Sequence, residues 1–115
     1  MIGIAMSTYQ NEAIIGETIR SLQAQASPFR CIIADDGSTD QTVQMIQQLT
    51  QHDERFEVIA LPHGERGIAR KTAIDRLKAL DVEYLYIIDS DMVLSDDLLK
   101  SCLLYLEAHP DIGAL

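Results

Sequence analysis

The stretch that decides the fold is "RCIIADDGSTDQTVQMIQQL", residues 30–49. Residues 30–35 form a short apolar run that ends in an aspartate, a pattern typical of a strand with both faces covered. Residues 43–49 carry apolar side chains at three-residue intervals, which places them on one face of a helix. Between the two lies a polar turn in which Ser38 and Gln41 have the spacing of a capping box. The stretch therefore predicts one strand–turn–helix unit.

This unit recurs along the chain. Short apolar runs of strand length occupy residues 2–7, 30–35, 56–61 and 83–89. Helical apolar spacing follows each run, at residues 15–22, 43–49, 69–80 and from 95 onward. Strands that alternate with helices over short connections predict an open, mainly parallel α/β sheet with right-handed crossovers and helices on both faces. Ligands of such sheets bind beyond the carboxyl ends of the strands, so the polar residues at those ends form the candidate site.

The chain is short and acidic. Its 115 residues make at most one domain of common size, and 47% apolar residues are enough for a core. Eighteen Asp and Glu against nine Lys and Arg give a net charge of −9, which argues against nucleic acid as a partner because such binding needs a cationic surface. An anionic ligand would need local compensation from a metal ion or from a few placed arginines.

The apolar segments are too short for a membrane. None approaches the roughly 18 to 20 apolar residues of a spanning helix, and residues 1–10 lack the charged start and long apolar run of a signal peptide. Cys31 and Cys102 lie in apolar patterns without metal-ligand spacing, which favours two buried thiols in a reducing compartment over a disulfide. We therefore expect no membrane segment and a cytoplasmic location.

Polar residues follow the first two predicted strands. The first strand ends in Ser7-Thr8-Tyr9, and the second ends in "DDGSTD". The second sequence is also typical of a turn with a helix cap, and capping does not exclude a binding role. At the mouth of the second strand, Asp36 is placed to accept a hydrogen bond from a nucleobase N–H. Uracil offers one such N–H and guanine offers two donors, whereas cytosine and adenine fit worse.

The loop after the third strand holds the densest basic cluster in this acidic chain. In "GERGIARK", residues 64–71, Arg66, Arg70 and Lys71 stand at the start of a predicted helix. Cations at a helix N-terminus oppose the helix dipole, so the cluster indicates an anion held between arginine and the helix end. The alternative is a solvated first turn. The lone histidines, His52 and His63, are interpreted as surface groups.

The fourth strand ends in Asp89-Ser90-Asp91. On an extended segment the two aspartates point to the same side, roughly 6.5–7 Å apart at the backbone, which is close enough to share one metal site. Hard divalent ions such as Mg²⁺ or Mn²⁺ take oxygen ligands and keep waters or phosphate oxygens. One aspartate would then bind the metal directly and the other through water or a ribose hydroxyl. An acidic, solvated turn is the alternative.

Four segments together resemble the nucleotide-binding half of a family-2 glycosyltransferase with the GT-A fold. They are "STYQNE", "IIADDGSTDQT", "GERGIARKTAI" and "YIIDSDMVLSDDLL", which stand in the family's order and at family-like separations over nearly the whole chain. Two positions depart from the family pattern. Gln10 replaces the usual Asn, and Lys71 stands where the family has Asn.

The resemblance implies a binding site for a nucleoside-diphosphate sugar, with uridine as the expected base. The implied nucleotide-binding residues are Ser7, Thr8, Tyr9, Asp36, Arg66, Asp89, Ser90 and Asp91. In the family's arrangement the first three line the base and ribose pocket, Asp36 holds the uracil N–H, and Arg66 reaches the base or the diphosphate. Asp91 is the expected direct ligand of Mn²⁺ or Mg²⁺, with Asp89 in support, and the metal helps the nucleoside diphosphate to leave.

The chain is shorter than the family's catalytic domains. We expect residues 1–115 to form a single nucleotide-diphospho-sugar-binding domain that is truncated relative to the full family domain. The missing half supplies the acceptor site and the general base, so no catalytic residue is assigned. An early end to the family's sheet would expose a strand edge, which predicts a homodimer or larger assembly that covers it.

Three other classes stay open beside a metal-dependent transferase. The first is a non-catalytic homologue that binds nucleotide or a protein partner without transferring sugar. The second is a phosphatase of the haloacid dehalogenase type, in which a D-x-D typically follows an early strand, with a lysine and further acids downstream; here only Lys100 follows as a lysine. The third is a purely structural α/β domain, in which the polar residues at all four strand ends would be there by chance.

Overall fold

Four parallel strands form an open sheet in the order β3-β2-β1-β4. The computed structural model describes residues 1–64, 67–80, 82–90, 92–95 and 98–108. The elements are β1 (Ile2–Thr8), α1 (Ile15–Gln23), β2 (Phe29–Asp36), α2 (Thr42–Thr50), β3 (Phe56–Leu61), α3 (Ile68–Ala79), β4 (Tyr84–Asp89) and α4 (Leu98–Ala108). The predicted parallel α/β fold is confirmed, and each predicted strand boundary lies within one residue of the observed one.

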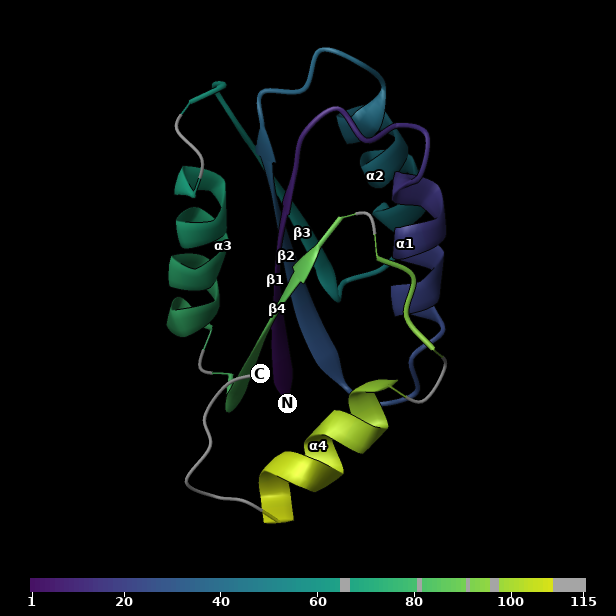
Figure 1. Cartoon of the computed structure of the whole chain (residues 1–115), viewed down its shortest axis with the longest axis vertical. Coiled ribbons are helices and arrows are strands. Elements are labelled where there is room, and N and C mark those ends of the chain that lie inside the picture. The colour runs from purple at the N-terminus through teal and green to yellow at the C-terminus, as the bar shows by residue number, and fades with distance from the viewer. Residues whose placement is uncertain (65–66, 81, 91, 96–97, 109–115) are drawn as a thin grey trace.

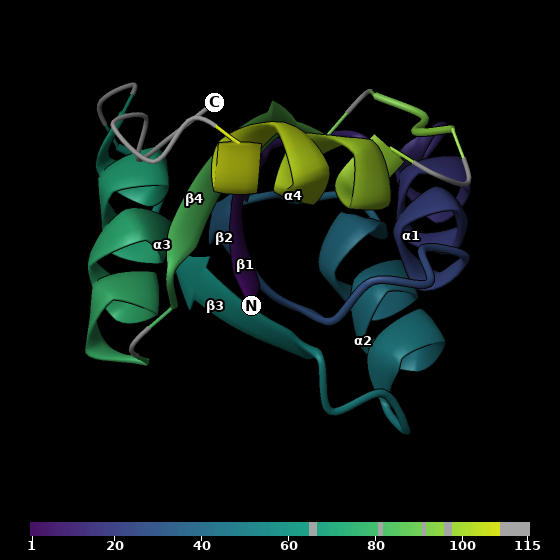
Figure 2. The same cartoon turned by 90° about the horizontal axis from the view of Figure 1, so that it is seen from below.

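Helices cover both faces of the sheet. In Figure 1, α3 lies on one face, and α1 and α2 lie together on the other. Figure 2 shows the same layers from below, with α4 beside the amino-terminal ends of the strands. The opposite edge of the sheet, where the strands end, is therefore left for the loops that follow β1 to β4.

Two apolar cores result, because successive residues of a strand point to opposite faces. Ile4 and Met6 of β1 are fully buried on the side of α1, α2 and α4. On the other side, Ala5 and Ala34 are fully buried against Ala73 of α3. These small side chains let α3 approach the strands closely, which explains why the face toward α3 is rich in alanine.

The strand register brings the four strand ends to one edge. Ser7 pairs with Asp89 on β4, and its neighbour Thr8 pairs with Asp35 on β2. β2 pairs with β3 as far as Asp36. Residues that are up to about eighty positions apart in the sequence thus become neighbours through the ladder alone, as the rule for parallel sheets requires.

The predicted capping box at Ser38 and Gln41 is wrong. α2 begins at Thr42, its N-cap residue Gln41 makes no side-chain capping hydrogen bond, and the backbone N–H of Thr42 donates to the carboxylate of Asp40 at 3.0 Å. Ser38 instead donates its backbone N–H and its hydroxyl to the carboxylate of Asp35, at 2.8 and 2.6 Å. The backbone N–H of Gln41 donates to Glu12, at 2.9 Å. The buried carboxylate of Asp35 needs donors, so it takes the hydroxyl that the helix would otherwise have used.

Both cysteines are free thiols. Cys31 is fully buried, which confirms its prediction, and Cys102 is half-buried on α4. Burial raises the pKa of both thiols and so keeps them protonated. Within the described ranges, no helix has the length and apolar character needed to span a membrane.

Candidate functional site

A cleft of about 600 Å³ opens at the carboxyl ends of the strands. Six of the eight predicted nucleotide-binding residues line it: Ser7, Thr8, Tyr9, Asp36, Asp89 and Ser90. The other two, Arg66 and Asp91, lie outside the described residues. A smaller hollow of about 350 Å³ adjoins Ser7, Asp89 and Arg70. The fold therefore brings the described candidates together, as the strand-end rule predicts, and their roles stay predictions.

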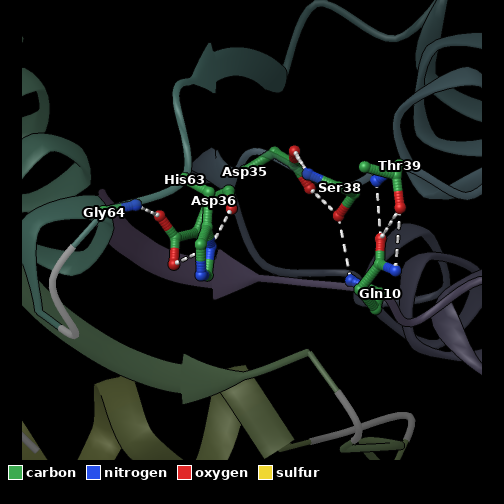
Figure 3. Close-up of polar contacts among 7 residues, drawn as sticks. All are labelled: Gln10, Asp35, Asp36, Ser38, Thr39, His63 and Gly64. Atoms are coloured by element: carbon green, nitrogen blue, oxygen red, sulfur yellow. Dashed lines mark hydrogen bonds and ion pairs between the residues drawn. The ribbon is translucent and has the colours of Figure 1, made fainter.

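The two adjacent aspartates at the end of β2 have different surroundings. Asp35 is buried, and its carboxylate builds the turn by accepting from Ser38. Asp36 lines the cleft, where one carboxylate oxygen accepts the backbone N–H of Gly64 at 3.0 Å. The other oxygen lies 3.3 Å from Nδ1 of His63. Figure 3 shows this separation, with Asp36 turned toward the loop after β3 and Asp35 toward Ser38.

His63 belongs to the cleft rather than to the bulk surface. Its ring stacks on Tyr9, with centroids 4.5 Å apart and planes 25° from parallel. Its Nδ1 also lies 3.0 Å from the carbonyl oxygen of Asp36. The interpretation of His63 as a plain surface group is therefore incomplete. The position of His63 just after β3 was the signal in the sequence that could have placed it in the cleft, because all four strands of the sheet end at this edge.

Gln10 joins the loops that follow β1 and β2. Its side-chain oxygen accepts the backbone N–H of Thr39 at 2.6 Å and that of Asp40 at 3.2 Å. Its side-chain amide donates to the Thr39 hydroxyl, and its own backbone N–H donates to Ser38 (Figure 3). Gln10 adopts a positive φ of 53°, which a non-glycine residue keeps only when its surroundings hold it. Gln10, which stands where the family has Asn, therefore makes hydrogen bonds that join the two loops.

The start of the D-S-D segment faces solvent. Asp89 is 66% exposed, and one of its oxygens lies 3.3 Å from a guanidinium nitrogen of Arg70 on α3. An exposed pair of this kind contributes little to stability. Both side chains are therefore free to rearrange around a ligand at little cost.

Ser90, by contrast, is buried and anchored to α1 and the loop before it. Its backbone carbonyl accepts the hydroxyl of Thr18 at 2.7 Å, and both residues are buried. Its own hydroxyl accepts the side-chain amide of Asn11. The residue between the two acids thus fixes the segment, while Asp89 beside it stays accessible.

Polar side chains on α1 and just after it hold the residues that follow Ser90. The Ser21 hydroxyl accepts the backbone N–H of Leu94 at 3.0 Å. The Gln25 amide donates to the backbone carbonyl of Ser95 at 2.6 Å. Thr18 and Ser21 stand three residues apart on α1, and Gln25 lies two residues past the end of that helix; we call these three residues the α1 polar row. All three are buried. The row attaches the segment after β4 by hydrogen bonds rather than by the sheet.

The donor set near Asp89 is sparse. Within the described residues, no three His, Cys, Asp or Glu side chains gather closely enough to hold a metal ion. A single exposed carboxylate fits a hard cation that takes most of its ligands from water and phosphate, as Mg²⁺ does.

Thr8 carries a polar atom without a partner in the described part of the chain. The residue is 3% exposed and lines the cleft, yet its hydroxyl makes no hydrogen bond there. A buried hydroxyl left unpaired costs about 1–3 kcal/mol.

Comparison with protein families agrees with the geometry. The family model for glycosyl transferase family 2 matches residues 3–115. The chain belongs to glycosyl transferase family 2. The resemblance stated from the four segments is thereby confirmed.

Curated relatives of this family-2 chain include larger bacterial enzymes. The poly(ribitol-phosphate) beta-N-acetylglucosaminyltransferase TarS of Staphylococcus aureus is 28% identical over an alignment of 110 residues, which covers 92% of this chain and 19% of TarS. The putative teichuronic acid biosynthesis glycosyltransferase TuaG of Bacillus subtilis is 31% identical over an alignment of 93 residues, which covers 79% of this chain and 36% of TuaG. The family-2 chain described here therefore spans well under half the length of these relatives.

Solved structures show the same fold. A crystal structure of S. aureus TarS in complex with UDP superimposes with a TM-score of 0.81 at 28% identity, covering 94% of this chain and 32% of the TarS chain. The mannosyltransferase PcManGT from Pyrobaculum calidifontis, solved with GDP-Man and Mn²⁺, superimposes with a TM-score of 0.72 over 91% of this chain and 32% of its own. At 19% identity the second match shows the fold alone. The parallel α/β sheet of this family-2 chain is thus that of GT-A glycosyltransferases.

Proposed function

We propose that the cleft binds a uridine-diphosphate sugar as the donor of a glycosyl transfer. The observation that carries the proposal is the carboxylate of Asp36, which faces the cleft beside the ring of Tyr9. A carboxylate only accepts hydrogen bonds, so it selects a base edge that presents an N–H, as uracil does. The TarS structure with UDP, at 28% identity and a TM-score of 0.81, supports the same ligand class.

The remaining cleft residues suit the rest of a nucleotide. The ring of Tyr9 offers a face on which a base stacks. Ser7 and Thr8 line the cleft and are proposed to contact the ribose or the base. Arg70 pairs with Asp89 at the exposed edge of the cleft and is proposed to turn toward a diphosphate, and Arg66 is proposed for the same anion.

We also propose a divalent cation, Mn²⁺ or Mg²⁺, at the D-S-D segment. Asp91 is the proposed direct ligand, and Asp89 supports it through water or a ribose hydroxyl. When bound, such an ion neutralises charge on the diphosphate and makes it a better leaving group. Ser90 is buried and anchored by Asn11 and Thr18, and the neighbouring Asp89 lines the cleft, which supports this proposal.

Calorimetric titration of UDP into the purified chain, with and without Mn²⁺, tests the donor proposal. We expect binding that strengthens with the metal, and we expect Asp36→Asn to weaken it because a side-chain amide presents only one acceptor oxygen. Asp75→Asn is the matched control, because Asp75 on α3 does not line the cleft. The absence of heat from UDP with metal present contradicts the proposal.

A second candidate is a non-catalytic chain that binds the nucleotide without transferring sugar. It shares the cleft with the first candidate and differs from it only in chemistry. Incubation with a UDP-sugar, followed by measurement of released UDP, separates the two. Release above the buffer rate, lost in Asp89→Asn, supports catalysis, and binding without release supports the second candidate.

Assembly and location are proposals as well. We propose that residues 1–115 form one donor-binding domain, and that it self-associates through the outer edge of β4. β4 has a strand partner on one side only in the described part of the chain, and its residues 84–87 are half-buried. Light scattering at tens of micromolar checks this, and a monomeric mass contradicts it. The two free thiols support a reducing, cytoplasmic compartment.

A further inference from the structure

The side chain of His63 contacts the same groups of the cleft that a bound nucleobase would contact. Its planar ring stacks on Tyr9, with centroids 4.5 Å apart. Its Nδ1 lies 3.3 Å from a carboxylate oxygen of Asp36 and 3.0 Å from that residue's carbonyl oxygen. The cleft in this structure therefore already contains an aromatic nitrogen heterocycle, and that heterocycle comes from the protein itself.

The chemistry of this contact fixes the direction of the hydrogen bond. Both oxygens that face Nδ1 of His63 are acceptors, so the contact is favourable only when Nδ1 carries a hydrogen. The ring then presents an N–H to the carboxylate of Asp36 while its face lies on Tyr9. A uracil ring that stacks on Tyr9 and donates its N3–H to Asp36 would use the same two partners.

The backbone of His63 is packed tightly against the neighbouring loop, whereas its side chain is largely exposed to solvent. A Cβ atom at Gly37 would lie 2.4 Å from the backbone nitrogen of His63, so the two loops pack tightly. The next residue, Gly64, donates its backbone N–H to the other oxygen of Asp36 at 3.0 Å. The His63 side chain is 60% exposed and has open solvent beside it. Because most of this side chain is exposed, we expect it to rotate out of the cleft without movement of the backbone.

We propose that His63 occupies the base subsite in the nucleotide-free chain and that a nucleobase displaces it. The inference rests on the proposed function, because it assumes that a base is bound by Asp36 and Tyr9. When the imidazole leaves, one oxygen of Asp36 stays oriented by Gly64 and the other becomes available. His63 is thus an internal competitor that weakens nucleotide binding and keeps the empty site ordered.

The substitution His63→Ala tests the proposal by calorimetry with two ligands in the presence of Mn²⁺. We expect UDP to bind about threefold to tenfold more tightly to the variant, the range that corresponds to the loss of one aromatic stacking partner. Inorganic pyrophosphate lacks a base, so its affinity should be unchanged. His52→Ala, which removes an exposed histidine outside the cleft, should leave both affinities unchanged.

Proton NMR of the unsubstituted chain gives a second measurement. The Hε1 resonance of His63 should start upfield, because Tyr9 shields it, and move toward a solvent-exposed value as UDP is added, while that of His52 stays still. Weaker UDP binding to His63→Ala overturns the proposal, because the ring would then be a wall of the base site. Unchanged UDP binding overturns it as well. If UDP binds neither the unsubstituted chain nor the variant, it is the donor proposal that fails.

Discussion

Replacing Thr18 with valine removes one hydroxyl and keeps the shape of the side chain. The backbone carbonyl of Ser90, which accepts that hydroxyl at 2.7 Å, would be left without this donor inside the protein. A buried acceptor that loses its partner costs about 1–3 kcal/mol. An unfolding entropy of about 0.24 kcal/mol/K, from the typical per-residue value over 115 residues, converts this into a Tm lower by about 4–12 °C.

The same substitution should loosen the D-S-D segment, because Ser90 stands between its two acids. We expect the ratio of the UDP affinities with and without Mn²⁺ to fall toward one in Thr18→Val. Thr18→Ser keeps the hydroxyl and serves as the matched control. Thermal unfolding followed by circular dichroism gives the Tm, and calorimetry gives the ratio of affinities.

Two results would refute this reasoning in different ways. If the valine and serine variants unfold within about 1 °C of each other, the Ser90 carbonyl has found another donor and the hydrogen bond does not matter for stability. If the valine variant is less stable but keeps the full metal dependence of UDP binding, the α1 polar row supports the fold without positioning the acidic segment.

Two further predictions concern Tyr9 and Asp53. Tyr9→Ala should weaken UDP binding by about fivefold to a hundredfold, because base–aromatic stacking contributes about 1–3 kcal/mol. Tyr9→Phe keeps the aromatic ring and should bind UDP normally. Equal UDP affinities of the two variants in calorimetry would contradict the stacking role. Asp53 accepts hydrogen bonds from the Arg55 guanidinium at 2.7 and 2.8 Å, which hold the pKa of Asp53 below its usual value. A lowered pKa in the folded state stabilises the chain above the unfolded pKa, so Asp53→Asn should lower the urea midpoint at pH 7, and the gap should close as the pH falls below about 4. A gap that is constant across this range would show that the charge of Asp53 does not contribute.

The sequence was sufficient to predict the strands and the edge at which the site lies. Buried parallel strands leave near-continuous apolar runs, such as residues 30–35, and the rule for strand ends then locates polar residues such as Asp36. The capping box failed for a local reason. The sequence spacing of Ser38 and Gln41 says nothing of the buried carboxylate of Asp35, which takes the serine hydroxyl.

The contacts that were missed depend on which strands are neighbours. His63 meets Asp36 because β3 lies beside β2, and the order of strands is not contained in local patterns. The α1 polar row left a readable signal, since Thr18 and Ser21 alternate with the apolar stripe of the same helix. What the sequence could not supply was the partner, Ser90, which lies seventy-two residues away from Thr18.

Asp35 and Asp36 have separate roles, and this separation has a consequence for how the ligand specificity of this chain could change. Asp35 builds the turn, and Asp36 carries the contact proposed for the base, so the fold and the choice of ligand are encoded by separate, adjacent positions. A substitution at the second position leaves the turn intact. Under the proposed function, evolution or protein engineering could therefore change the base preference by single substitutions at Asp36. Selection would eliminate substitutions at Asp35, because they would impair folding.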